Sequence, residues 1–105
     1  MKIVWSPLAV ERASEIVDYI AQDKLLAAEK WIQTVFSKVE QLRLNPEIGR
    51  IVPEINDRLF RELIYGNYRI IYHIEMKQIS ILTIRHGKQI LPIDEYINND
   101  SGVEL

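Results

Sequence analysis

The feature that most constrains the fold is a change in the spacing of apolar residues near position 58. Before it, apolar residues recur every three or four positions, which is typical of amphipathic helices. After it they form short runs separated by Gly66-Asn67 and Met76-Lys77, which is typical of strands joined by tight turns. Helical and strand patterns are therefore segregated along the chain, which predicts an α+β fold.

Two helices are expected in the first half of the chain, at about residues 7–22 and from Asp23 to the Asn45-Pro46 pair. Ser6-Pro7 is a strong start signal, because serine caps the first turn and proline suits the first helical position. The apolar stripe of the second helix includes Trp31 and Phe36, which are expected in the core. A short turn joins the helices, so they should form an antiparallel hairpin.

The expected strands are residues 59–65, 68–75 and 78–85, with a further short strand at residues 2–5. The sequence thus predicts an N-terminal strand and a two-helix hairpin packed on an antiparallel sheet of about four strands. A short helical turn is expected near residues 92–97. The chain is expected to be one domain over residues 1–105, with 98–105 as a polar, flexible tail.

Composition excludes several kinds of site. The chain has no cysteine, so disulfides, thiolate metal sites and a cysteine nucleophile are ruled out. No histidine spacing suggests a metal, and no nucleotide-binding or hydrolase motif is present, so we expect no cofactor. No apolar run approaches the roughly 20 residues needed to cross a bilayer, and the N-terminus lacks a signal-peptide pattern. We therefore expect a cytoplasmic protein with no membrane contact.

Charge is distributed unevenly along the chain. Residues 58–93 carry six Lys or Arg and two Asp or Glu, whereas residues 94–105 carry four acids and no base. The formal net charge of the whole chain is −2. Any contact with nucleic acid would therefore have to use the segment 58–93.

Strand pairing predicts which of these charges share a face. If Gly66-Asn67 is a two-residue turn, Arg69 and Glu62 lie on the same open sheet face. If Met76-Lys77 is also a two-residue turn, His86 joins them, whereas a one-residue slip would put Arg85 there instead. Arg69 could then pair with Glu62 or act on a ligand. His86 could be a general acid–base or a strand-end histidine bonded to backbone.

Short motifs in a fixed order cover nearly the whole chain. They are Trp5-Ser6-Pro7, Asp18-Tyr19-Ile20-Ala21, Ala27-Ala28, Asn45-Pro46-Glu47-Ile48-Gly49-Arg50, Val52-Pro53-Glu54, Arg61-Glu62-Leu63, Tyr68-Arg69-Ile70-Ile71-Tyr72 and Ile81-Leu82-Thr83-Ile84-Arg85-His86-Gly87-Lys88. In these motifs the chain resembles the RelE/ParE toxin superfamily, which includes the plasmid stabilisation proteins.

The resemblance implies a type II toxin that is neutralised by direct binding of a cognate antitoxin. RelE-like members are metal-independent endonucleases that cut mRNA in the ribosomal A site, and ParE-like members poison DNA gyrase without a nuclease site. A third possibility is an inactive relic that only binds antitoxin. Induction of the chain without antitoxin would separate the three.

Comparison of this sequence with the residues of RelE nucleases, position by position, favours the ParE-like alternative. Phe60 and Glu62 stand where RelE nucleases carry paired lysines, Gln89 replaces an expected arginine, and Tyr96 is displaced by one position. If the chain is nevertheless a nuclease, the resemblance implies catalytic roles for Arg69, His86 and Glu54. Target or substrate binding would fall to four cations: Arg61, Arg69, Arg85 and Lys88.

Overall fold

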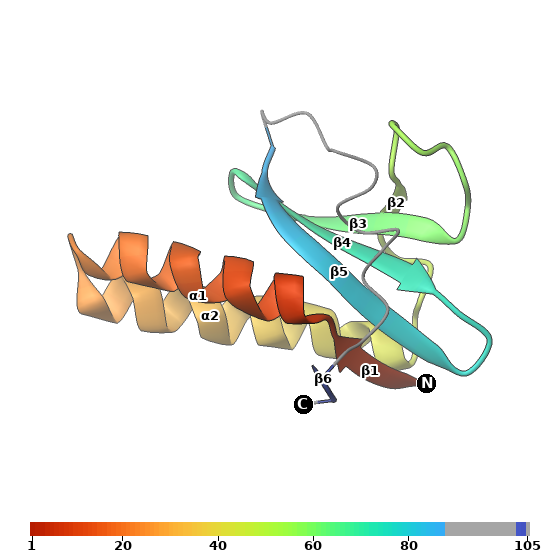
Figure 1. Cartoon of the computed structure of the whole chain (residues 1–105), viewed down its shortest axis with the longest axis horizontal. Helices are drawn as coiled ribbons and strands as arrows, with labels where there is room; N and C mark the ends of the chain where they lie inside the picture. The colour runs from red at the N-terminus through yellow and green to blue at the C-terminus, as the bar shows by residue number, and fades with distance from the viewer. Residues whose placement is uncertain (88–102, 105) are drawn as a thin grey trace.

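The computed structural model describes residues 1–87 and 103–104. Two helices lie side by side against one face of a twisted sheet (Figure 1). The elements follow the order β1 (Lys2–Trp5), α1 (Pro7–Ala21), α2 (Leu25–Glu40), the short 3-10 helix η1 (Gln41–Arg43), β2 (Arg50–Ile51), β3 (Phe60–Tyr65), β4 (Tyr68–Ile74), β5 (Gln78–His86) and β6 (Val103–Glu104). The predicted α+β fold is confirmed, and the turn expected near residues 92–97 lies outside the described residues.

The sheet has the strand order β2-β3-β4-β5-β1-β6. Strands β2 to β5 pair antiparallel, as expected, but β1 runs parallel to β5, so the sheet is mixed rather than purely antiparallel. The chain passes through the two helices between β1 and the rest of the sheet. The β3–β4 and β4–β5 hairpins then reverse the chain twice, so β5 runs in the same direction as β1. No helix in the described part of the chain is long and apolar enough to cross a bilayer.

Ser6 begins α1 as the sequence predicts. Its hydroxyl accepts a hydrogen bond from the Ala9 backbone nitrogen at 3.0 Å and donates one to the Leu82 carbonyl at 2.8 Å. The Ser6 backbone nitrogen donates to the Ile81 carbonyl at 2.9 Å. One residue therefore caps the helix and anchors its start to β5.

The main core lies between the helices and the sheet. Small residues on α1, Ala9 and Ala13, are buried and allow close approach, while Trp31 of α2 packs against two tyrosines of the β3–β4 hairpin. Phe36 departs from the expected core position, because it is 41% exposed and packs edge-on against Trp5 at 5.3 Å. Although Phe36 belongs to the apolar stripe of α2, its side chain lies at the surface between α2 and β1.

The turn between β3 and β4 confirms the predicted register. Tyr65 pairs with Tyr68, and Gly66 adopts a φ of +57°, the left-handed conformation that such a tight turn requires. The next hairpin also begins in the expected register, with Ile74 opposite Ile79. A β-bulge then shifts the pairing by one residue between Ile71 and Tyr72.

The sheet face away from the helices is not open over its centre. The segment between β2 and β3 folds over it and forms a second, smaller apolar cluster. Its buried members are Val52, Ile71 and Leu82, with Ile55 and Phe60 packed against them. The expectation of an open face is therefore wrong for this region, because the segment has apolar residues of its own to bury.

Candidate functional site

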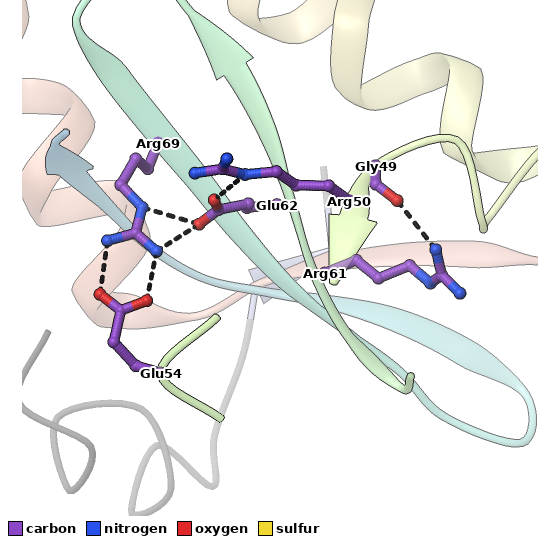
Figure 2. Close-up of polar contacts among 6 residues, drawn as sticks. All are labelled: Gly49, Arg50, Glu54, Arg61, Glu62 and Arg69. Carbon is purple, nitrogen blue, oxygen red and sulfur yellow. Dashed lines mark hydrogen bonds and ion pairs between the residues drawn. The ribbon is translucent and has the colours of Figure 1, made fainter. Parts of the chain in front are cut away.

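Glu62 and Arg69 lie diagonally on neighbouring strands, β3 and β4, on the sheet face away from the helices. Figure 2 shows the Arg69 Nε donating to Glu62 Oε1 at 2.7 Å, and a terminal nitrogen of Arg69 lies 2.6 Å from the same oxygen. The two residues are only 5% and 1% exposed. The ion pair predicted from strand register is confirmed.

Glu54 completes the environment of Arg69. It lies in the segment that follows β2, and its two carboxylate oxygens accept hydrogen bonds from the two terminal nitrogens of Arg69 at 2.7 and 2.8 Å (Figure 2). This bidentate geometry is the strong form of an arginine–carboxylate pair. All three guanidinium nitrogens of Arg69 therefore contact carboxylates of the chain itself.

Arg50 supplies the second cation. Its Nε donates to Glu62 Oε2 at 2.5 Å, so Glu62 bridges two arginines. The Arg50 side chain is 59% exposed, whereas that of Glu62 is fully buried. We call Arg50, Glu54, Glu62 and Arg69 the arginine–glutamate cluster; its formal charges, two positive and two negative, cancel.

The cluster shifts the protonation of its members. The hydrogen bonds from Arg69 lower the pKa of Glu54, against a smaller opposing effect of burial. The hydrogen bonds with Glu54, followed by those with Glu62, raise the pKa of Arg69. Glu54 is thus an ionised partner of a permanent cation. It is a weak base at neutral pH, since a good general base has a pKa near the working pH.

Arg61 holds the backbone before β2. Its Nε donates to the Arg58 carbonyl at 2.9 Å, and a terminal nitrogen donates to the Gly49 carbonyl at 2.9 Å (Figure 2). The Tyr72 hydroxyl accepts from the Gly49 nitrogen at 3.0 Å and donates to the Pro46 carbonyl at 2.7 Å. Only glycine fits at position 49, because a Cβ would lie 2.6 Å from both the Tyr72 hydroxyl and the Glu62 carbonyl.

His86 does not share a face with Arg69, so that expectation is wrong. The bulge places Arg85 directly opposite Arg69 and His86 opposite Tyr68. Tyr68 belongs to the helix side of the sheet, and its ring meets that of His86 edge-on at 5.8 Å. The alternative expectation, Arg85 beside Arg69, is confirmed, although a bulge within the strands produces it and not a slip at the turn.

The structure therefore brings together two of the three residues predicted for catalysis, Glu54 and Arg69, and separates the third. Of the four predicted binding cations, Arg69 and Arg85 are neighbours, Arg61 is engaged by backbone carbonyls, and Lys88 lies outside the described residues. Arg50 was missing from the predicted set. Its position directly after Gly49 in a loop motif is the only sequence signal for it.

A separate apolar groove runs along the outer surface of α1 and α2 beside β1. It is lined mainly by Trp5, Val10, Ala13, Val17, Ile32 and Phe36. A second hollow continues it past Trp5 and Phe36 toward Ile3 and Val39. Groups of three or more metal-binding side chains do not occur among residues 1–87 and 103–104.

Comparison with protein families identifies the chain. A family described as "ParE toxin of type II toxin-antitoxin system, parDE" matches residues 3–91. The chain belongs to the ParE toxin family. The match covers both helices and the sheet from β1 to β5, including the arginine–glutamate cluster.

The fold is similarly that of a ParE-type protein. A solved structure described as "Chromosomal ParDE TA system from P. aeruginosa" aligns with a TM-score of 0.67 and 22% sequence identity. The alignment covers 82% of this chain and 95% of the other. No curated protein sequence is significantly similar to the chain.

Proposed function

We propose that this ParE-family chain is a toxin that inhibits DNA gyrase through protein contacts and is neutralised by a cognate antitoxin. The observation that carries the proposal is the arginine–glutamate cluster. Cleavage of RNA needs cations for the phosphate and groups that move protons. In the cluster Arg69 is held by two carboxylates, and Glu54 is ionised by its pairing.

The other residues that the resemblance implied for a nuclease, Arg61 and His86, do not lie with Arg69 in one site. Arg61 binds loop carbonyls, and His86 lies on the helix side of the sheet against Tyr68. The residues that the resemblance implied for catalysis, Arg69, His86 and Glu54, therefore do not form one centre on one sheet face. A target bound through protein contacts needs none of these groups.

The direct test adds the purified chain to purified gyrase and relaxed plasmid with ATP. We expect supercoiling to fall as the chain is added, with RNA in the same tube left intact. Induction in cells should likewise relax plasmids. Cuts at codon positions in translated mRNA, with normal supercoiling, would instead establish the nuclease alternative. Absence of both effects, together with normal growth, would make the chain a relic.

The apolar groove is the surface we assign to the antitoxin. An amphipathic helix buries its apolar face in such grooves. Val10 is 40% exposed and lines the groove, so Val10→Asp should weaken binding of the small protein encoded beside this gene by at least about tenfold. Leu44→Asp is the matched control, because Leu44 is 89% exposed and lies outside the groove. Equal affinity of the two variants would contradict the assignment.

A further inference from the structure

The apolar groove on α1 and α2 has a border of carboxylates. On α1, Glu11 and Asp18 each follow a groove residue by one position, Val10 and Val17 respectively. Both acids are exposed, so they lie on the solvent side of the groove. Seven positions separate them, which is about two helical turns, so both flank the groove along the same side of α1.

The second helix supplies the opposite border. Glu29 precedes Ile32 by three positions and Glu40 follows Phe36 by four, so both acids lie on the groove side of α2. Both are exposed. Glu40 forms an ion pair with Arg43, whereas the other three border carboxylates form no ion pair with the described residues. The border therefore keeps a negative charge along both helices.

The bases of the two helices lie away from this border. Arg12 lines a different hollow, which it shares with Tyr68 on the sheet side of α1. Lys38 lies over the ring of Tyr65 at 5.5 Å, beside β3. Lys30 stands two positions before a groove residue, a spacing that places the two side chains on different sides of a helix. The groove thus combines an apolar floor with acidic sides.

We propose that the groove binds one helix of a partner protein, and that this helix carries Lys or Arg on both sides of its apolar face. Val10, Ala13 and Val17 line the groove at the spacing i, i+3 and i+7, which an amphipathic partner helix repeats. They span about 10 Å, so about three turns of partner helix suffice. Flanking bases would meet the acidic border, and flanking acids would be repelled by it. This rests on the proposed function, because the partner is the antitoxin assigned to the groove, and it adds the charge of the antitoxin's binding helix.

Two synthetic peptides of about 18 residues serve as probes. They share a face of leucines at helical spacing, and the flanking positions are all Lys in one peptide and all Glu in the other. In titration calorimetry the Lys-flanked peptide should bind the unaltered chain at least about tenfold more tightly at about 0.05 M salt, with a smaller difference at about 0.5 M. Val10→Asp should weaken binding of the Lys-flanked peptide, since Val10 lines the groove; binding that Val10→Asp leaves unchanged would overturn the proposal.

The outcomes separate this proposal from the proposed function. Equal affinity of the two peptides would overturn the basic helix and leave the groove as an antitoxin site. Failure of both peptides to bind would overturn the groove as a helix site. Neither result bears on toxicity, because the gyrase assay contains no partner helix.

Variants of the full chain test the border itself. The double variant Asp18→Asn, Glu29→Gln removes two border charges and should reduce the preference for the Lys-flanked peptide to about twofold. The double variant Asp23→Asn, Glu47→Gln is the matched control, because it removes two exposed carboxylates that lie outside the groove. It should keep the full preference. An undiminished preference in the border variant, or an equal loss in the control, would overturn the proposal.

Discussion

At the scale of single residues, the structure decides between the roles that the sequence leaves open for the Arg69 side chain. The sequence leaves two roles open for Arg69, an ion pair with Glu62 and contact with a ligand. In the folded chain its guanidinium is bound by Glu62 and also by Glu54, and Glu62 also binds Arg50. Strand register places Arg69 beside Glu62, so that contact can be predicted from the sequence. The contact with Glu54 depends on how the segment after β2 folds over the sheet, which the sequence does not indicate.

Arg69→Met should destabilise the fold by about 3 kcal/mol, because Glu62 would be left fully buried with only Arg50 as partner. Urea unfolding measures the loss. Arg58→Met is the control, since Arg58 is exposed and its side chain should contribute less than about 0.5 kcal/mol. A double Arg69→Met, Glu62→Leu variant should recover most of the stability, and a double variant as unstable as Arg69→Met would contradict this account.

The lowered pKa of Glu54 predicts a dependence of stability on pH. The unfolded chain takes up the Glu54 proton near the ordinary value of 4.5, whereas the folded chain takes it up only at lower pH. The stabilisation is therefore complete above about 4.5 and is lost as the pH falls through the lowered pKa. Urea midpoints should fall more steeply below this pH for the unaltered chain than for Glu54→Gln. Parallel curves would show that the pair with Arg69 does not contribute.

At the scale of elements, the sequence predicts those parts that depend on local patterning. The Ser6-Pro7 helix start, the Gly66 turn and the Tyr65–Tyr68 register all follow from local backbone requirements. The second helix begins at Leu25, and its N-cap residue is Lys24 rather than the expected Asp23, without a side-chain cap. The bulge in β5 inserts one residue within the strand rather than at the turn, and the sequence carries no local signal for it, so the placement of His86 could not be predicted.

The loop before β2 illustrates an element held by tertiary contacts, and it carries its own prediction. Tyr72→Phe should cost about 1–3 kcal/mol, because the buried Gly49 nitrogen loses its acceptor and the Pro46 carbonyl loses its donor. Thermal or urea unfolding measures the difference. Tyr19→Phe is the matched control, since Tyr19 is 70% exposed and should change stability little. Indistinguishable losses would mean that the Tyr72 hydroxyl does not hold the loop.

At the scale of the whole molecule, the first and last strands of the core are neighbours. Ser6 ties them together, because its hydroxyl bonds to Ala9 at the start of α1 and to Leu82 of β5. Sequence patterning indicates that β1 is a strand but contains no information on its partner. The parallel contact arises only when the complete chain closes on itself.

Ser6→Ala should reduce stability by about 2 kcal/mol, roughly half from the lost helix cap and half from the lost bond to β5. Equilibrium unfolding with circular dichroism measures it. Ser37→Ala serves as the control, because Ser37 is exposed within α2 and alanine favours a helix. A Ser6→Ala loss no larger than that of the control would show that the contact with Leu82 does not help to close the fold.

The parallel pairing of β1 with β5 also has a consequence during synthesis. The Ser6 side chain leaves the ribosome 76 residues ahead of its partner, Leu82. At a translation rate of about 5–20 residues per second, the first strand waits roughly 4–15 s before β5 exists. Throughout that time the nascent chain cannot complete its sheet, because β1 has no β5 to pair with. The sheet of this ParE-family chain can therefore close only after β5 has been synthesised, which places its completion late relative to β1 and both helices.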